Sequence, residues 1–280
     1  MDKKLVDLFI KNAIAEDVGD GDHTSLSTIP LGTQGKAQLI VKDAGILAGV
    51  ELAIEIFNQI DSKLVVTTYI QDGSAVKVGD IVLTVQGSTH SILLSERLVL
   101  NCMQRMSGIA TKTNRIVNLL APYQTKVLDT RKTTPGLRYL EKWAVKIGGG
   151  VNHRMGLYDM ILIKDNHVDY AGGIANAIEA ANQYLVKTGM ALAIEIEVRN
   201  LDELKQVLSV GNVQRIMLDN FELPLLKEAV RLVNGKFITE ASGGIVEGNV
   251  ADYAACGVDY ISMGALTHSV KSLDLSLKAC

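Results

Sequence analysis

The chain has 280 residues, of which 48% are hydrophobic and 21% are charged, and its 28 Lys and Arg stand against 31 Asp and Glu. This composition is close to the globular average and excludes a disordered chain, while no apolar run approaches the ~20 residues that cross a bilayer. The formal charge of -3 excludes a molecule-wide basic field of the kind that attracts nucleic acid. At about 150 residues per domain, the length predicts one large domain or two modest ones.

The N-terminus and the cysteines predict a cytoplasmic protein with no membrane partner. Charged residues interrupt the apolar positions of residues 1–20, whereas a secretory signal needs a continuous apolar stretch. Cys102, Cys256 and Cys280 are too few and too scattered for a disulfide framework and form no CxxC pair. We therefore expect a reducing compartment.

Positive charge is concentrated in one segment of this acidic chain. Residues 131–164 contain seven Lys or Arg against two Asp or Glu, a local charge of +5 that leaves -8 for the remainder. Such a local excess indicates a small anionic ligand.

The first part of the chain mixes helical and strand patterns. Residues 3–16 have the helical rhythm of an amphipathic helix, with Leu5, Leu8, Phe9 and Ile10 between charges. Strands are predicted at 36–41, 64–70 and 81–85, a helix at 50–60, and a β-hairpin over 72–87, where Gly and Asp occupy turn positions. We expect an N-terminal α+β domain over residues 1–110.

From about residue 125 the pattern becomes a regular alternation of strands and helices. The expected strands are 127–129, 160–164, 192–198, 215–219, 236–242 and 259–264. The expected helices are 137–148, 173–186, 201–208, 223–233 and 246–256. This alternation predicts a parallel sheet, and because neither GxGxxG nor GxxxxGK[ST] is present, an α/β barrel over residues 111–280 is favoured over a doubly wound sheet.

Polar side chains follow almost every one of these strands, and in a barrel such ends converge on one face. Arg131, Lys132, Arg154 and Lys164 offer planar guanidinium forks and compact ammonium charges, a combination suited to a ligand with several anionic groups. The alternative is a solvated face paired with nearby acids.

Carboxylates on two neighbouring strands are candidates for a second role. Glu195 and Glu197 alternate and so share one face, and Asp219 ends the next strand. They can bind ribose hydroxyls, hold water-coordinated Mg²⁺ or offset a developing positive charge, or they can simply neutralise the basic residues. For Glu195 the two interpretations are equally favoured.

The last two strand ends carry small residues. Residues 240–245 (EASGGI) and 262–266 (SMGAL) expose backbone N–H groups where barrels frequently bind phosphate, although tight turns alone explain the same residues. The histidines show no metal-ligand spacing.

Several long motifs resemble the quinolinate phosphoribosyltransferase family, a type II phosphoribosyltransferase family. They are EDVGDGDHTS, ERLVLNCMQRMSGIAT, DTRKTTPGLRYLEKWAVKIGGGVNHRMGLYDMILIKDNH, IEIEVRNLDEL, IMLDNF, EASGGI and DYISMGALTHS, and they cover nearly the whole chain. The resemblance implies an N-terminal α/β open sandwich domain and an incomplete, TIM-like α/β barrel whose last helix packs back on the N-terminal domain. It implies synthesis of nicotinate mononucleotide, CO₂ and pyrophosphate from quinolinate and phosphoribosyl pyrophosphate with Mg²⁺, in NAD biosynthesis.

The resemblance also implies roles for individual residues. Lys132, Glu197 and Asp219 match catalytic positions, and the two acids also match positions that hold the metal, through water. Substrate binding is implied for Arg105, Arg131, Lys132, Thr133, His153, Arg154, Lys164, Glu197, Asp219, Ser242, Gly243, Gly244 and Gly264. Arg105 matches an arginine supplied by the neighbouring subunit, so a homodimer with shared sites, or a higher oligomer containing it, is expected.

Three alternatives differ in testable ways. A molybdate-transport-associated paralogue would depart from the motifs TRKTTPG and NHR, which are intact here. A Schiff-base lyase would use Lys164 as its nucleophile and would be inactivated by borohydride with a carbonyl substrate. A phosphate-binding module would bind its ligand without turnover.

Overall fold

The computed structural model describes residues 2–280, and the chain divides into two compact units. Unit 1 comprises Met1–Asn114, Thr134–Gly149 and Ser269–Cys280, and unit 2 comprises Arg115–Thr133 and Gly150–His268. The chain therefore passes repeatedly between the two units.

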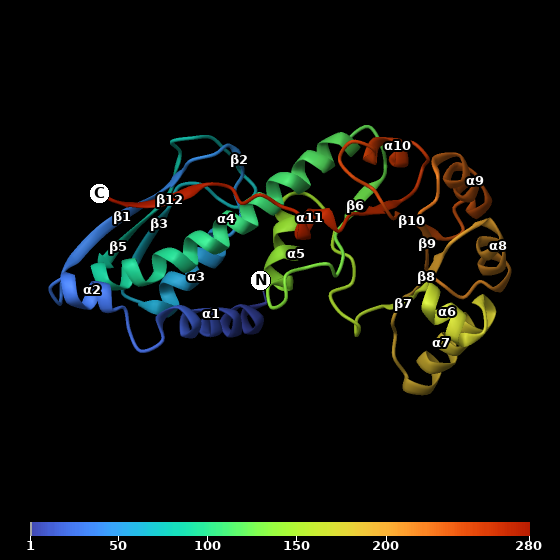
Figure 1. Cartoon of the computed structure of the whole chain (residues 1–280), viewed down its shortest axis with the longest axis horizontal. Helices are drawn as coiled ribbons and strands as arrows, with labels where there is room; N and C mark the ends of the chain where they lie inside the picture. The colour runs from blue at the N-terminus through green and yellow to red at the C-terminus, as the bar shows by residue number, and fades with distance from the viewer. Residues whose placement is uncertain (1) are drawn as a thin grey trace. The chain divides into compact units, whose positions relative to one another are not determined.

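Unit 1 contains an antiparallel sheet of four strands in the order β12-β1-β5-β3. These strands are β1 (Gln34–Val41), β3 (Val65–Thr68), β5 (Ile81–Ser88) and β12 (Leu275–Ala279). Its helices are α1 (Lys3–Val18), α2 (His23–Thr28), α3 (Val50–Ile60), α5 (Arg138–Ile147) and the first part of α4 (Thr89–Leu120). Figure 1 shows α3 and α4 on one face of the sheet, which gives the open sandwich that was expected.

Helix α1 begins at an N-cap, because the Asp2 carboxylate accepts hydrogen bonds from the backbone N–H groups of Lys4 and Leu5. It buries Val6 and Ile10, which lie four residues apart on one face. Leu5 and Leu8 remain 45% and 58% exposed. The helix thus leaves part of its apolar surface uncovered within unit 1.

The expected hairpin over residues 72–87 is wrong. A turn does form, with the backbone N–H of Lys77 donating to the Asp80 carboxylate. The strand before it, β4 (Ala75–Val76), pairs with β2 (Gly45–Ile46), whereas β5 pairs with β1 and β3. The alternation of apolar and polar residues predicts strands but not their partners. Here β5 pairs with β1, which is distant in sequence, rather than with β4.

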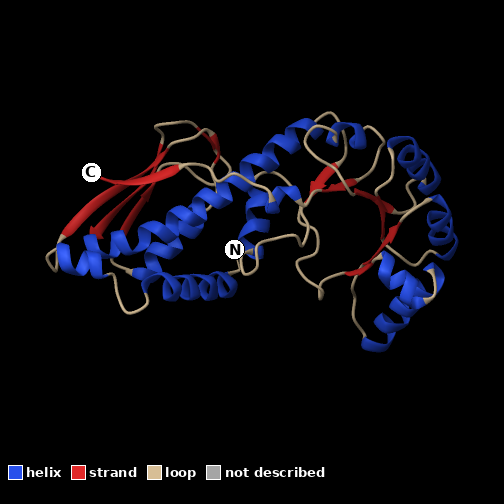
Figure 2. Cartoon of the chain, viewed as in Figure 1, coloured by secondary structure: helices blue, strands red, loops and turns tan. Residues whose placement is uncertain are grey.

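Unit 2 contains six parallel strands in the order β6-β11-β10-β9-β8-β7. They are β6 (Lys126–Leu128), β7 (Ile161–Ile163), β8 (Ile194–Val198), β9 (Arg215–Asp219), β10 (Ile238–Ser242) and β11 (Tyr260–Ser262). Its helices are α6 (Asp165–Ala171), α7 (Ile174–Thr188), α8 (Leu201–Val210), α9 (Leu223–Val233), α10 (Val250–Ala254) and α11 (Ala265–His268). Figure 2 shows the strands curving with helices outside them, as in a barrel.

The sheet is open between its edge strands, β6 and β7. Strands β7 to β11 are neighbours in chain order and β6 returns beside β11, which is barrel order rather than the reversal of a doubly wound sheet. On the β6 side, Val151 forms an isolated parallel bridge with Leu128. The incomplete barrel is therefore confirmed, and residues 151–154 run along its open edge.

The chain ends in a strand rather than in a helix, because β12 pairs with β1 in unit 1. Its approach depends on Gly108 in α4, where a Cβ atom would overlap the backbone carbonyl oxygen of Lys271. The backbone N–H of Leu273 donates to the Gln104 carbonyl one turn earlier on the same helix. The close approach of residues 271–272 to α4 therefore requires glycine at position 108.

Replacement of Gly108 by alanine is expected to destabilise the protein by about 1–3 kcal/mol, because overpacking against a backbone carbonyl exceeds the ~1 kcal/mol that alanine ordinarily gains in a helix. Urea denaturation measures the change. Gly248→Ala is the matched control, since nothing lies within 4 Å of its added Cβ. Equal stability of the two variants would contradict the prediction, because residues 271–272 would then move away from α4 at no energetic cost.

Candidate active site

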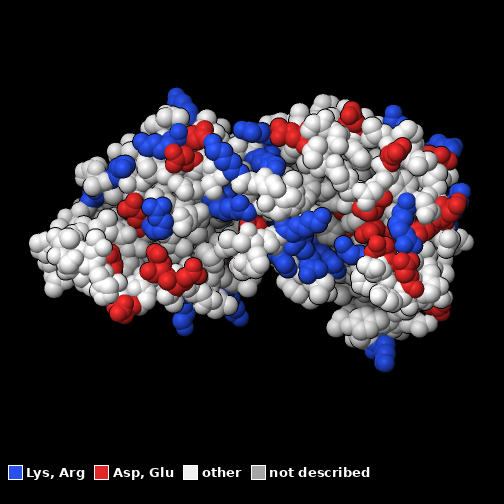
Figure 3. Space-filling model, in the orientation of Figure 1, with Lys and Arg blue, Asp and Glu red and all other residues white. Residues whose placement is uncertain are grey.

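The strand ends of unit 2 bring most of the expected site residues to one edge of the sheet. Arg131, Lys132 and Thr133 follow β6, Lys164 follows β7, Glu197 lies on β8, Asp219 ends β9, Ser242 ends β10, and Gly264 follows β11. In Figure 3, Lys and Arg side chains form a dense group over the loops between β6 and β7, with Asp and Glu side chains grouped beside them. Charges of both signs therefore share this edge.

Lys132 is held against the loop that follows β11. Its carbonyl accepts a hydrogen bond of 2.8 Å from the Thr267 hydroxyl, and its backbone N–H donates to Thr130 Oγ1. The Lys132 side chain passes close to Gly264, because a Cβ on that glycine would lie 2.9 Å from Lys132 Cδ. The exposed Lys132 thus lies beside a candidate phosphate loop.

Arg154 is 9% exposed, although it carries a guanidinium group. Its Nη1 donates to the Met160 carbonyl at 3.1 Å, which fixes the side chain at one end. Burial, reinforced by repulsion from Arg131, lowers the pKa of Arg154 from its usual value. Two neighbouring guanidinium groups that repel each other form a site that an anion would stabilise.

Glu197 and Asp219 form an acidic pair with Lys164 nearby. Burial raises the pKa of both carboxyls, and repulsion from Asp219 raises that of Glu197 further, while Lys164 lowers both. Asp219 also accepts a hydrogen bond from the Asn220 side chain at 2.6 Å. The pair is therefore held together at a cost in electrostatic energy that a cation would relieve.

The loop after β10 bends sharply at Gly243, whose φ is +94°. A Cβ there would overlap Asn220, which itself adopts a positive φ and donates its backbone N–H to the Ser242 carbonyl. Gly244 also has a positive φ, of +62°, and faces open space. The geometry leaves this backbone accessible, as a phosphate-binding loop requires.

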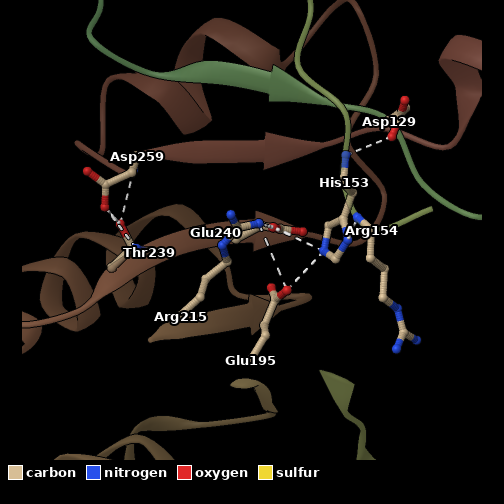
Figure 4. A network of polar contacts seen from close by, with 8 residues as sticks. All are labelled: Asp129, His153, Arg154, Glu195, Arg215, Thr239, Glu240 and Asp259. Atoms are coloured by element: carbon tan, nitrogen blue, oxygen red, sulfur yellow. Dashed lines mark hydrogen bonds and ion pairs between the residues drawn. The ribbon is translucent and has the colours of Figure 1, made fainter. Parts of the chain in front are cut away.

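A second charged group lies deeper, inside the sheet (Figure 4). Glu195 and Arg215 are register neighbours on β8 and β9, and Arg215 Nη1 donates to Glu240 Oε2 on β10 at 2.9 Å. His153 Nε2 lies 2.9 Å from Glu195 Oε2 and 3.6 Å from Glu240 Oε2. Burial raises the pKa of both glutamates to about 7. These raised pKa values favour protonation of the carboxyls beside the single positive charge of Arg215.

This buried cluster is not the candidate metal position. His153, Glu195 and Glu240 offer ligand atoms that lie within 4.8 Å of one another. The guanidinium of Arg215 already forms an ion pair with the carboxylate of Glu240, so it supplies the positive charge that a metal ion would otherwise bring. The oxygen-only pair of Glu197 and Asp219 suits Mg²⁺ better.

Arg105 lies in unit 1, on α4, and not among the strand ends. Its Nη2 forms a 2.8 Å ion pair with the buried carboxylate of Glu141 on α5, which also accepts from the backbone and hydroxyl of Thr134. Both Arg105 and Glu141 line a hollow of about 680 Å³ within unit 1, whose wall includes Leu5 and Leu8 of α1.

Sequence patterns missed Arg215, Glu240 and Glu141 as site-supporting residues. Side chains alternate between the two faces of a strand, so Arg215 lies on the same face of β9 as Asp219, four residues away. This two-residue alternation could have identified Arg215 from the sequence. The neutral cluster that Arg215 forms with Glu240 depends on strand register, which sequence does not show. No local signal pairs Glu141 with Arg105, since they lie on different helices.

An open barrel of parallel strands with basic loops, an acidic pair and glycine turns at its strand ends defines an enzyme of the barrel phosphoribosyltransferase class. Two family models match the chain: "Quinolinate phosphoribosyl transferase, N-terminal domain" over residues 22–107 and "Quinolinate phosphoribosyl transferase, C-terminal domain" over residues 109–278. The chain belongs to the quinolinate phosphoribosyltransferase family, and its enzymatic class is that of the decarboxylating phosphoribosyltransferase of NAD biosynthesis.

Curated relatives and solved structures agree with this assignment. The chain is 47% identical to a mitochondrial quinolinate phosphoribosyltransferase [decarboxylating] of Nicotiana tabacum, over 96% of this chain and 80% of that protein. It is 42% identical to a probable nicotinate-nucleotide pyrophosphorylase [carboxylating] of Bacillus subtilis, over 98% and 92%. The nicotinate-nucleotide pyrophosphorylase structure from Francisella tularensis superposes with a TM-score of 0.93 at 39% identity, covering 100% of this chain and 98% of that one.

Within the described residues no helix is long and apolar enough to cross a membrane.

The raised pKa of Glu240 predicts a pH-dependent stability. Because the folded state keeps a proton that the unfolded carboxyl releases near pH 4.5, the free energy of unfolding falls as pH rises from about 4.5 to about 7. The slope is up to about 1.4 kcal/mol per pH unit for one proton. We expect Glu240→Gln to flatten this slope in urea titrations at several pH values. Exposed Glu228→Gln is the control, and an unchanged slope in Glu240→Gln would contradict the prediction.

Proposed function

We propose that the strand ends of unit 2 are where quinolinate and phosphoribosyl pyrophosphate react to give nicotinate mononucleotide, CO₂ and pyrophosphate. The observation that carries the proposal is that basic loops and an acidic pair occur at the same strand ends, because the reaction combines polyanionic substrates with a transient positive charge. Lys164 interacts electrostatically with both carboxylates, a pairing that suits an anion-binding site better than the Schiff-base alternative.

In this proposal the guanidinium groups of Arg131 and Arg154 and the ammonium group of Lys164 bind the two carboxylates of quinolinate. The repulsion between Arg131 and Arg154 in the free site supports this role, since a dicarboxylate neutralises it. Lys132 and Thr133 contact the phosphates, together with the turns of Ser242, Gly243, Gly244 and Gly264. The hydrogen bond from the Thr267 hydroxyl to the Lys132 carbonyl, which holds Lys132 beside the turn of Gly264, supports the shared phosphate role.

Glu197 and Asp219 are proposed to act on the ribose. As the bond between ribose C1 and pyrophosphate breaks, C1 becomes oxocarbenium-like, and carboxylates fixed nearby stabilise that charge more in the transition state than in the ground state. Lys132 offsets the negative charge that gathers on the departing pyrophosphate. Both effects require groups that are positioned before the substrates arrive.

The acidic pair is proposed as the Mg²⁺ site, which the chemistry of two partly buried carboxylates on neighbouring strands supports. Glu197 and Asp219 would hold the ion, directly or through water, and the ion would neutralise phosphate charge.

We propose that decarboxylation follows ribosylation. The pyridine nitrogen attacks C1 and pyrophosphate leaves, then the bond between ring C2 and its carboxylate breaks, CO₂ departs, and the electron pair at C2 takes up a proton. The quaternised ring is the better electron sink, which supports this order. A single-turnover experiment should trap no decarboxylated product that lacks ribose, and such a product would overturn the order.

A homodimer with shared sites is proposed from the surface of unit 1. Arg105 lines a hollow beside Leu5 and Leu8, which are apolar and exposed, and such a surface is stabilised by a partner. In the dimer, Arg105 of one protomer would reach the strand ends of the other.

For the functional division of the chain we propose residues 1–110 and 111–280, which the family matches at 22–107 and 109–278 support. Three free cysteines, two of them buried, support the cytoplasm as the compartment.

Purified protein supplied with quinolinate, phosphoribosyl pyrophosphate and Mg²⁺ is expected to release CO₂ and form nicotinate mononucleotide. Lys132→Ala should lower kcat about a hundredfold or more, because an electrostatic contact made at the leaving group is lost. Lys205→Ala, on the exposed face of α8, is the control and should retain full activity. Absence of product with the unaltered protein would refute the proposed reaction.

Mixing two inactive variants tests the shared site. Arg105→Ala and Lys132→Ala should each be inactive alone, yet an equilibrated equimolar mixture should recover about one quarter of normal activity, because each heterodimer of C₂ symmetry keeps one intact site. Product formation is followed alongside mass spectrometry of the exchanged dimers. No recovery despite proven exchange would contradict a site completed by Arg105 of the partner.

A further inference from the structure

The imidazole of His153 has both nitrogens directed at protein groups. The backbone N–H of Arg154 donates to Nδ1 at 2.7 Å, and since an amide N–H only donates, Nδ1 must carry a lone pair. This hydrogen bond assigns the proton to Nε2, which faces the carboxylate oxygens of Glu195 at 2.9 Å and Glu240 at 3.6 Å. The side chain is 6% exposed. A neutral ring so enclosed offers no free donor to a substrate carboxylate.

The same residue is held by its main chain. The buried carboxylate of Asp129, which follows β6, accepts the backbone N–H of His153 at 2.8 Å. Opposite, Glu240 is held by Arg215, whose guanidinium lies 4.8 Å from the ring centre of Tyr260 on β11. His153 therefore connects the open edge of the sheet to β8, β9 and β10 across its interior (Figure 4).

We infer that His153 is a positioning residue rather than a substrate ligand: its imidazole ties the backbone of Arg154 to the buried carboxyls of Glu195 and Glu240 and so fixes the guanidinium that receives quinolinate. The inference rests on the proposed placement of Arg154 in the quinolinate site. It revises the expectation that His153 binds substrate itself and gives Glu195, Glu240 and Arg215 a function.

Arg154 needs such support because its segment lies where the sheet is open. Residues 152–154 have no strand ladder on the β7 side, and Val151 supplies a single bridge to β6. His153 holds the backbone N–H of Arg154, and the Met160 carbonyl holds its Nη1. Arg154 is therefore fixed both at its backbone and at its guanidinium group. A displacement of about 1 Å in a substrate-positioning group can cost a hundredfold in rate.

A double-mutant cycle on the quinolinate Kd separates the two roles. His153→Gln keeps a donor for Glu195 but loses the acceptor for the Arg154 N–H, and we expect it to raise the quinolinate Kd about tenfold or more with little change in the KM of phosphoribosyl pyrophosphate. In an Arg154→Ala background the same change should alter the Kd less than about twofold, because His153 acts only through Arg154.

The control cycle combines His153→Gln with Lys164→Ala, because His153 does not contact Lys164. In this cycle the two fold-changes in the quinolinate Kd should multiply. Multiplication in the Arg154→Ala background as well would show that His153 binds quinolinate independently and would overturn the inference. Turnover by the unaltered protein is measured in parallel. If the unaltered protein shows no turnover, the proposed function is refuted. If it turns over and the effects of His153→Gln and Arg154→Ala on the quinolinate Kd multiply, only this inference is refuted.

A second measurement needs no variant. In nitrogen-15 NMR spectra of the unaltered protein, His153 should show an unprotonated Nδ1 and a protonated Nε2 both before and after quinolinate is added. Exposed His23, whose ring Nε2 lies 3.3 Å from the Asp20 carboxylate, serves as the internal reference. Conversion of His153 to the doubly protonated form on quinolinate binding would show a direct cationic ligand and overturn the inference.

Discussion

The structure of unit 2 depends on a charge balance inside its sheet. Parallel barrels ordinarily fill their interior with branched apolar side chains, yet here Glu195, Arg215 and Glu240 occupy inward positions on three adjacent strands. Burying them is tolerable only as a complete set, because removing one partner of a buried ion pair typically costs about 3–5 kcal/mol. The strands are therefore held in a register that keeps these groups together.

That same balance separates two layers of charge. In the deep layer, the raised pKa values of Glu195 and Glu240 reduce the negative charge that faces the guanidinium of Arg215. The outer layer has exposed Lys132 and Lys164 and the acidic pair of Glu197 and Asp219. Anion selectivity can thus be set by the loops, while the interior holds those loops in place.

Much of the fold follows from periodicity, because short apolar runs and helical spacing are local properties. The helix predicted at residues 50–60 has the bounds of α3, and all six strands of unit 2 were expected within a few residues of their observed bounds. The candidate site residues were predicted through strand ends and through resemblance. What failed was pairing: β4 joins β2 rather than β5, because partner choice depends on contacts distant in sequence.

The role of His153 shows the same limit at the site. Its place in the motif NHR predicts a residue of the candidate site, but sequence does not show which way the ring points. In the structure Asp129, after β6, holds the backbone N–H of His153, and the ring points to Glu195 on β8. Only the folded arrangement distinguishes a side chain that touches substrate from one that holds its neighbour.

The return of β12 to the sheet of unit 1 has a consequence for synthesis of the protein. Domains usually fold in order as they leave the ribosome. Here β1 lies between β5 and β12, and β12 (Leu275–Ala279) follows the whole of unit 2 in the sequence. One edge of β1 must therefore wait, with unpaired backbone groups, while unit 2 is translated. Aggregation through that exposed edge during synthesis is the hazard this topology creates.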